Sequence, residues 1–163
     1  MKSLNDVFVV LHNVHSLQRV IELAKITYGL GYSSFIVSKA VGTAAQVGVP
    51  EAQKIALKCG GRLVFVADLT DAVDLLHPDV IYLFAPKPYG RVPYDSGDVL
   101  NHLADGSSVM LVFGGLEPGL SSKELSMGFS TYLDVPGNIG SIGSASIVLY
   151  QLRKAFDAAV LRR

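Results

Sequence analysis

Two apolar stretches of this 163-residue chain each lead directly into a glycine-containing loop, and these loops are well suited to bind a ligand. Residues 109–113 (VMLVF) precede GGLEPGLS, and residues 132–135 (YLDV) precede PGNIGSIG. Glycine has no side chain, so backbone N–H and C=O groups beside it can approach a ligand closely. Because α/β proteins bind ligands at the carboxyl ends of their strands, the two loops predict one shared ligand site.

A third loop carries cationic and aromatic side chains in alternation. It follows residues 80–84 and reads KPYGRVPY, so that Lys87 and Arg91 are interleaved with Tyr89 and Tyr94. Cationic side chains can bind a phosphate and aromatic rings can stack on a nucleobase. The same composition is also typical of a surface loop stiffened by proline, and the sequence leaves both interpretations open.

No metal site is predicted from the residues that commonly bind metals. The single cysteine, Cys59, has no partner for a metal motif or an internal disulfide, and we expect it to be buried near a helix end. The histidines are dispersed without the spacing of a metal-binding motif: His12, His15, His77 and His102.

One group of acidic residues could suit a magnesium-dependent nuclease. Asp68, Asp71 and Asp74 are close together in the sequence, and such enzymes need clustered carboxylates. These residues also lie where a helix is expected to begin, and negative charge is favourable at a helix N-terminus. The helix-start explanation is preferred for these acids, so a small nuclease is a less favoured prediction than the functions described below.

The elements that must position these loops indicate an α/β domain with a mainly parallel sheet. Apolar runs alternate with amphipathic helical patterns along the chain. Six strands are predicted, at 7–11, 34–37, 62–66, 80–84, 109–113 and 132–135. Helices are predicted at 16–30, about 50–59, 70–76, about 98–104 and 144–161. Ser16 and Thr70 are expected to cap helix N-termini, and Gly31 and Gly60 to follow helix ends.

Composition is typical of one globular domain spanning residues 1–163. Half of the residues are apolar and 17% are charged, which excludes a disordered chain. No apolar run reaches the roughly 20 residues that cross a bilayer, and the N-terminus does not resemble a signal peptide. With its lone cysteine, the chain is expected to be cytoplasmic, without a membrane partner.

Net charge is zero, from 14 basic and 14 acidic residues. Modules dedicated to nucleic-acid binding are usually basic on one face, so charge argues against strong unaided affinity for RNA. The predicted last helix is apolar around much of its circumference, at Ile147, Val148, Tyr150, Leu152 and Phe156. Such a helix usually packs on two partners, here the sheet and a second subunit.

The two glycine-containing loops resemble the second and third signatures of the SpoU-like RNA methyltransferases in the SPOUT superfamily. Phe113, Gly114, Gly119, Leu120 and Ser121 match the second signature at its spacing. Residues 135–136 and 141–143, with the helix that follows, are similar to the third. The resemblance implies a deep trefoil knot in the C-terminal part and a homodimer with sites across its interface. It also implies S-adenosylmethionine bound in the knot.

Residue by residue, the resemblance places the cofactor against Gly114, Val135 and Ser141 or Ile142. The loop containing Ala85 would complete the wall. These contacts would be backbone hydrogen bonds and apolar packing, for which small and aliphatic side chains suffice. Plain turn geometry is the alternative explanation for the glycines of these loops.

The chain departs from the family pattern at several positions. Leu116 stands where the family has a glutamate, with Glu117 one position later, and Gly143 replaces an asparagine. The first signature matches least well: an alignment anchored on Gly31 places Lys25 at the family's arginine and Arg19 at its asparagine.

From the resemblance we predict an S-adenosylmethionine-dependent RNA methyltransferase that modifies a ribose 2′-hydroxyl of tRNA or rRNA. The predicted catalytic residues are Arg19, Lys25 and Glu117, and Lys87 and Arg91 are predicted to bind RNA phosphate. Lys25 lacks the bidentate fork of an arginine. The alternative is a non-catalytic RNA-binding or scaffold protein that retains the knot fold.

Overall fold

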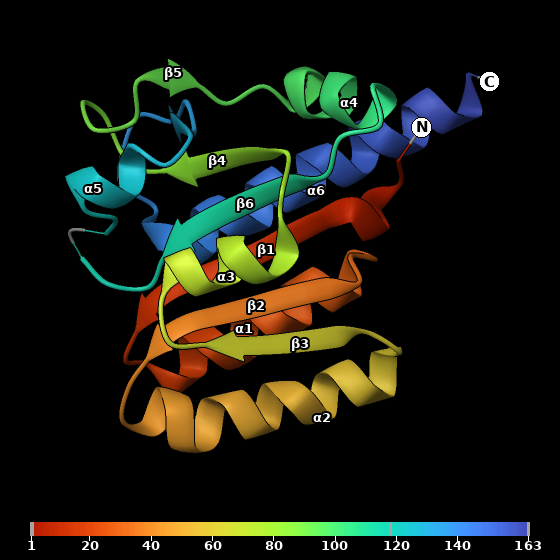
Figure 1. Cartoon of the computed structure of the whole chain (residues 1–163). Helices are drawn as coiled ribbons and strands as arrows, with labels where there is room; N and C mark the ends of the chain where they lie inside the picture. The colour runs from red at the N-terminus through yellow and green to blue at the C-terminus, as the bar shows by residue number, and fades with distance from the viewer. Residues whose placement is uncertain (1, 118, 163) are drawn as a thin grey trace.

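The computed structural model describes residues 2–117 and 119–162 and contains one seven-stranded sheet (Figure 1). The strand order is β3-β2-β1-β6-β4-β7-β5, and every pairing is parallel. The strands are β1 (Val7–Val14), β2 (Ser34–Ala40), β3 (Arg62–Val66), β4 (Val80–Phe84), β5 (Val92–Pro93), β6 (Val109–Gly114) and β7 (Phe129–Tyr132).

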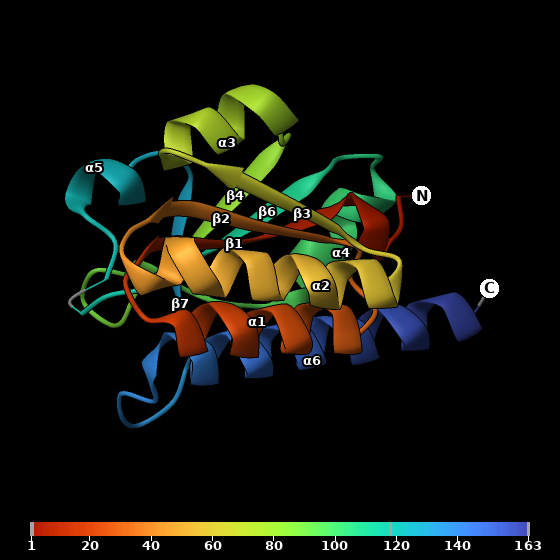
Figure 2. The ribbon, with the colours of Figure 1, turned by 90° about the horizontal axis from the view of Figure 1, so that it is seen from below.

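Helices cover both faces of the sheet (Figure 2). The longer helices α1, α2 and α6 lie on one face together with α4, whereas α3 and α5 lie on the other. Although α6 has 22 residues, neither it nor any other helix in the described ranges is long and apolar enough to cross a bilayer. The helical segments are η1 (Leu4–Asp6), α1 (Leu17–Gly29), η2 (Ala44–Gly48), α2 (Val49–Cys59), α3 (Leu69–Leu76), α4 (Ser96–Ala104), α5 (Ser122–Leu125) and α6 (Gly140–Leu161).

The central strand β1 shows how the two faces are filled. Val9 and Leu11 belong to the larger core beneath α1 and α6, whereas Val10 belongs to the smaller core beneath α3. Successive side chains of a strand point to opposite faces. The next side chain on the α3 face is therefore that of His12, a polar residue at the end of an otherwise apolar run.

The predicted α/β class, the parallel sheet and the flanking helices are confirmed, but the sheet has seven strands rather than six. The missed strand is β5, whose two residues include a proline and carry no recognisable pattern. The last strand was predicted at 132–135 and occurs at Phe129–Tyr132. Its buried side chains include Ser130 and Thr131, so apolar patterning placed the strand too late.

Most of the predicted helix boundaries are correct to within a few residues. Three details differ from the prediction: the residue that caps α3, the start of the last helix and the burial of Cys59. Asp68, rather than Thr70, caps α3. The last helix begins at Gly140, four residues before its predicted start. Cys59 is exposed, not buried, because it is the last residue of α2 and lies beyond the buried Ala52 and Ala56, in a final turn that is exposed.

Candidate functional site

The carboxyl ends of the parallel strands meet at one edge of the sheet, on the left of Figure 1. The loop that follows β6 begins there and leads to α5. Because side chains alternate between the two faces, this edge carries two separate groups of residues. A polar cluster lies on the α3 and α5 face, and a cleft lies on the α6 face.

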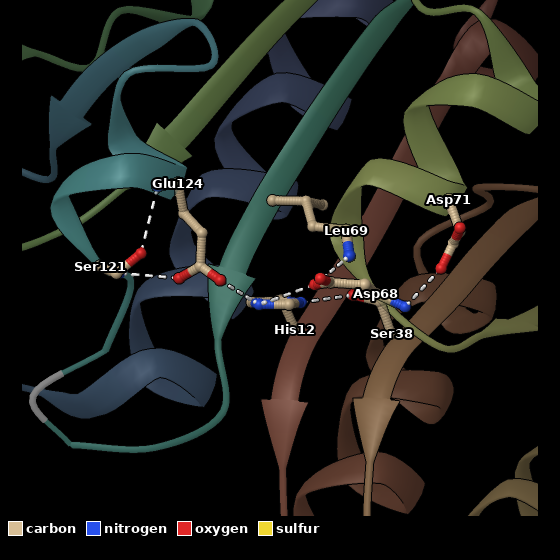
Figure 3. A network of polar contacts seen from close by, with 7 residues as sticks. All are labelled: His12, Ser38, Asp68, Leu69, Asp71, Ser121 and Glu124. Atoms are coloured by element: carbon tan, nitrogen blue, oxygen red, sulfur yellow. Dashed lines mark hydrogen bonds and ion pairs between the residues drawn. The ribbon is translucent and has the colours of Figure 1, made fainter.

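The polar cluster consists of His12, Asp68 and Glu124 (Figure 3). His12 Nε2 lies 2.5 Å from Glu124 Oε2 and 3.9 Å from Asp68 Oδ1. Within the described residues, the imidazole and carboxylate ligand atoms of these three side chains all lie within 4.8 Å of one another. They come from β1, the N-terminus of α3 and the first turn of α5, so only the folded chain brings them together.

The imidazole of His12 is held in one orientation from both sides. Its side chain is fully buried, and Nδ1 lies 2.8 Å from the hydroxyl oxygen of Ser38 on the neighbouring strand β2. A hydrogen bond at one ring nitrogen determines the role of the other. Nε2 is thereby directed at the two carboxylates, where it can share a proton or bind a cation.

Both carboxylates are fixed by caps of the helices that carry them. Glu124 Oε1 accepts a hydrogen bond from the Ser121 N–H at 2.8 Å, and its Oε2 faces His12. Asp68 Oδ1 accepts from the Leu69 N–H at 2.7 Å. The two acids are therefore held in place by short, local hydrogen bonds.

The environment keeps Glu124 ionised and leaves the cluster open on one side. Partial burial by itself raises the pKa of the Glu124 carboxyl. The hydrogen bond from the Ser121 N–H and the nearby His12 outweigh that effect, so the pKa lies below its ordinary value. The Asp68 side chain is 55% exposed, against 19% for Glu124, so solvent reaches the cluster past Asp68.

This set of side chains fits a divalent cation. One imidazole nitrogen and two carboxylates are ligands used by Zn²⁺ and other transition-metal dications, and catalytic sites commonly have three protein ligands. The hydrogen bond between His12 and Glu124 also fits, because a metal ion displaces a proton from its ligand. No metal site was predicted from the sequence, because Asp68 and Glu124 lie 56 and 112 positions after His12 and form no motif with it.

The cleft on the α6 face lies among the loops that follow β4, β6 and β7. The stacked rings of Phe84 and Phe113, with centroids 4.6 Å apart, form part of its wall. The β6 loop folds back on itself: a Cβ placed on Gly114 would lie only 3.1 Å from the Gly119 Cα, so the two ends of the loop are close together. Further lining comes from Ala85, Leu116, Glu117, Leu133, Val135, Gly137, Asn138, Ile139, Gly140, Ser141 and Ser144.

The structure brings together most of the residues that the resemblance implied for a cofactor. Ala85, Gly114, Val135 and Ser141 all line this cleft. Ile142 instead packs against the larger hydrophobic core. The cleft therefore has the position expected from the sequence, at the carboxyl ends of successive strands.

The predicted catalytic residues are not gathered at one place. Glu117 lines the cleft, and the guanidinium of Arg19 donates a hydrogen bond to the carbonyl of Gly115 in the same loop. Lys25 is six residues further along α1, about 9 Å along the helix axis. It lies on the exposed face of that helix.

The two predicted phosphate ligands also lie apart. Lys87 is 3.9 Å from a carboxylate oxygen of Asp134, and its ammonium lies 4.5 Å from the centroid of the Tyr132 ring. Arg91 lines a different groove, next to α5. The loop that carries both residues therefore does not form one phosphate site.

Sequence signals for the polar cluster exist but are local. Ser121 and Glu124 have the spacing of a capping box, which predicts the start of a helix at α5. Asp68 lies two residues after the end of β3, at the carboxyl edge of the sheet, where α/β proteins commonly bind ligands. What no local pattern shows is that His12 lies between the two acids.

Sequence comparisons relate the chain to nucleases. The family model described as RecB-family nuclease (DUF2122) matches residues 42–151. A protein of Aeropyrum pernix is 41% identical over 148 residues, which are 90% of this chain and 92% of that protein. One of Methanocaldococcus jannaschii is 32% identical over 151 residues, 93% of this chain and 99% of its own length. The names of both assign them provisionally to the type II restriction enzymes.

Structural comparisons relate the fold to methyltransferases. A probable methyltransferase from Bordetella pertussis superposes with a TM-score of 0.75 at 17% identity, over 94% of this chain and 95% of that one. The SpoU methyltransferase AviRb from Streptomyces viridochromogenes, crystallised with AdoMet, gives 0.70 at 16% identity, over 94% and 62%. The similarity to SpoU proteins expected from the loops is thus confirmed for the fold.

The predicted function, S-adenosylmethionine-dependent methylation of RNA, is wrong. The family match and both relatives, which align along nearly the whole chain, indicate a nuclease. The physical reason is that the matched glycines determine how loops turn at the sheet edge, and the same fold can carry different reactions. The acidic and amide side chains that would distinguish the methyltransferases are those replaced here by Leu116 and Gly143.

Proposed function

This chain belongs to the family described as RecB-family nuclease (DUF2122), and on this premise we propose that it hydrolyses phosphodiester bonds in nucleic acid. His12, Asp68 and Glu124 hold a divalent cation for this reaction. The observation that carries the proposal is the convergence of these three side chains at the ligand-binding edge of the sheet.

Each residue of the cluster has a distinct role in this proposal. His12 provides Nε2, kept in orientation by Ser38 at its other ring nitrogen. Glu124 provides an ionised carboxylate held by its helix cap, and Asp68 provides a second carboxylate on the side open to solvent. When bound, a dication supplies Lewis-acid polarisation of a phosphodiester and activation of water. The exposed side of Asp68 is where a substrate would approach.

Cation binding is tested first, by isothermal titration of Mn²⁺ into protein freed of metal with a chelator. Both acids also cap helices, so the substitutions are Asp68→Asn and Glu124→Gln, which keep an oxygen that can accept the capping hydrogen bond. Loss of an outer partner of a metal ligand typically weakens binding by about 10- to 100-fold. Loss of a direct ligand should have at least that effect.

Asp71→Asn is the matched control. Asp71 lies in the first turn of the same helix and its carboxylate accepts from the Asp68 N–H, but it is not part of the cluster. Its variant should bind Mn²⁺ as the wild type does. Equal affinity of Asp68→Asn, Asp71→Asn and the wild type would show that the cluster is not a cation site.

Hydrolysis is then followed with end-labelled DNA and RNA, single-stranded and duplex, with Mn²⁺ or with EDTA. Products are expected only with the cation, and Asp68→Asn and Glu124→Gln should abolish them while Asp71→Asn does not. Cleavage that persists in EDTA, or in both cluster variants, would overturn the proposed function.

A second candidate function is the binding of S-adenosylmethionine in the cleft on the α6 face. It is favoured by the glycine-containing loops that line this cleft and by the AdoMet complex of a protein with the same fold. The trefoil knot expected from the resemblance is part of this candidate function, because threading of the C-terminal chain would hold the loops around the cofactor together. This candidate concerns binding of the cofactor alone and does not include methyl transfer to RNA.

Titration of S-adenosylmethionine into the folded protein tests this candidate. Gly114→Val should abolish binding, because the added side chain would meet the backbone at Gly119 and fill the cleft. An experimental structure with the ligand would also show whether the backbone is threaded. The absence of heat at millimolar ligand would remove the candidate.

The homodimer expected from the last helix is a further proposal. Ile139 caps α6, and Ile147 and Tyr150 lie in its first half. Their side chains are between 37% and 54% exposed, which leaves apolar surface that a second subunit could cover. Sedimentation equilibrium checks it, with Tyr150→Glu expected to shift a dimer toward monomer. A monomer at high concentration would contradict it.

A further inference from the structure

The strands β1 and β2 share an irregularity directly beyond the polar cluster. Side chains of β1 alternate between the two cores as far as His12, so Val14 should lie on the α3 face together with His12. Val14 belongs instead to the larger core beneath α1 and α6. In β2, Val37 and Ala40 are three positions apart, and both contact that same core. The alternation is therefore broken once in each strand.

Backbone dihedral angles locate the break at Asn13 and Lys39. Their φ angles are 60° and 53°, in the left-handed region. The two residues lie opposite each other, because His12 pairs with Ser38 and the next pair follows two residues later in both strands. In the described chain the third non-glycine residue of this kind is His77, at the end of α3. Asparagine and histidine adopt positive φ several times more often than other side chains, so Lys39 is the unusual one.

A lysine with this backbone conformation lowers stability in a way that glycine would not. Left-handed backbone brings the Cβ close to the following carbonyl oxygen, and glycine has no Cβ. Strained residues persist where the surrounding structure holds them, and they are concentrated at active sites and ligand-binding segments. The strain at Lys39 therefore calls for a role of its side chain.

Lys39 ends a strand that lies in the middle of the cation cluster. It directly follows Ser38, whose hydroxyl oxygen is 2.8 Å from Nδ1 of His12. In the sheet, β2 lies between β1, which carries His12, and β3, which leads to Asp68. Lys39 is therefore at the carboxyl edge, next to the strand that leads to the exposed carboxylate of the cluster.

The Lys39 side chain is exposed and carries a charge that no ion pair uses. Within residues 2–117 and 119–162, ion pairs are formed by other cationic side chains: Lys2, His12, Lys54, Lys87 and Arg153. An ammonium group is a compact point charge with three donors, and lysine is a common phosphate ligand. Beside a bound dication, such a group is suited to hold a phosphodiester.

We propose that Lys39 binds a phosphate of the nucleic-acid backbone beside the cation cluster, and that the left-handed backbone places it there. The inference rests on the proposed function, since it names the residue that positions the substrate of the phosphodiesterase. Lys39 holds the substrate and takes no part in proton transfer. Phosphates are accessible in duplex and in single-stranded nucleic acid alike, so the contact fits both.

Binding is measured without catalysis, by fluorescence anisotropy of labelled duplex and single-stranded DNA and RNA in EDTA at low salt. Lys39→Gln should weaken binding by about 10-fold or more, as expected for loss of a hydrogen bond to a charged group. On duplex DNA it should also reduce the slope of log affinity against log salt by about 0.9, the value for one phosphate. Lys39→Arg keeps the charge and should restore both quantities. Mn²⁺ affinity should be unchanged in either variant.

Lys39→Gly separates phosphate binding from a structural role. Glycine adopts positive φ without strain, so this variant should unfold at the wild-type midpoint or up to about 5 °C above it. It should nevertheless bind as weakly as Lys39→Gln.

Two matched controls lie at the opposite edge of the sheet. His77→Gly relieves the same kind of backbone shortly before β4 begins, and Lys58→Gln removes an exposed charge shortly before β3 begins. Both should bind oligonucleotides as the wild type does.

The outcomes separate this inference from the proposed function. Binding that depends on Lys39 but is never followed by cleavage with Mn²⁺ would support the phosphate site and remove the phosphodiesterase. Cleavage by Lys39→Gln with the KM of the wild type, or wild-type binding by Lys39→Gly, would overturn the phosphate site and leave the phosphodiesterase. An equal loss of binding in Lys58→Gln would also overturn the phosphate site. A wild type that neither binds nor cleaves any of these nucleic acids would overturn both.

Discussion

Gly115 is the residue whose substitution most directly tests how the sheet edge is built. It lies in the loop after β6, between the polar cluster and the cleft. Its N–H donates to the His12 carbonyl at 2.7 Å, and its carbonyl accepts from Arg19. A Cβ here would lie 2.6 Å from the Val14 Cβ and 2.7 Å from the Asn13 carbonyl oxygen.

The expected effect of Gly115→Ala follows from these distances. Carbon atoms are ordinarily about 3.5–4.0 Å apart, so the loop or the end of β1 must move by about 1 Å. Val14 is fully buried and the other contact is backbone, so neither yields easily. Overpacking of this kind typically costs about 1–3 kcal/mol, and weakening a buried hydrogen bond costs a further ~1–3 kcal/mol. We expect a loss of about 2–6 kcal/mol in the free energy of unfolding.

Urea denaturation and thermal unfolding measure this loss. For a domain of this size, 1 kcal/mol corresponds to about 2–4 °C, so the midpoint should fall by roughly 4–24 °C. Gly137→Ala is the matched control, because a Cβ there meets nothing within 4 Å, and it should stay within about 0.5 kcal/mol of the wild type. Equal midpoints for the wild type and both variants would refute the reasoning.

Three further predictions concern individual side chains. Ser38→Ala should weaken Mn²⁺ binding about 10-fold or more in titration calorimetry, because His12 loses the partner that orients its ring; unchanged affinity would contradict this. Asp68→Ala should lower the free energy of unfolding by ~1 kcal/mol through loss of the α3 cap, whereas Asp68→Asn should not; equal loss in urea denaturation would argue against the cap. Burial raises the pKa of Tyr28 and Tyr82 to about 12 from the ordinary 10.0, so the stability that their neutral forms contribute is complete below about pH 10 and is lost as pH rises through 12. Tyrosinate absorbance, followed with denaturation midpoints at each pH, checks this, and full ionisation near pH 10 in the folded protein would refute it.

Local patterns predicted those parts of the fold whose residues are strongly apolar or strongly amphipathic. The strands at 62–66 and 80–84 occur at the predicted residues, because continuous apolar runs suit strands covered on both faces. The strand Phe129–Tyr132 was displaced in the prediction because it buries hydroxyl groups. β5 went unpredicted because it has two residues and depends on its neighbour β7.

For the candidate site, too, local patterns predicted one part correctly and another part wrongly. The cleft was predicted because its residues lie in a few short loops, each following an apolar strand, and strand ends in a parallel sheet converge by necessity. The reaction expected there was wrong, because loop glycines specify a backbone path and not the chemistry beside it.

The sequence by itself determined a parallel α/β domain, the positions of its loops and the edge at which a ligand would bind, since these follow from local periodicity and turn residues. Only the tertiary structure decided that His12, Asp68 and Glu124 meet, and that β1 and β2 break their alternation together beside them. The physical reason is that strand order and the direction of each side chain depend on packing between segments far apart in the chain, which no local pattern of residues records.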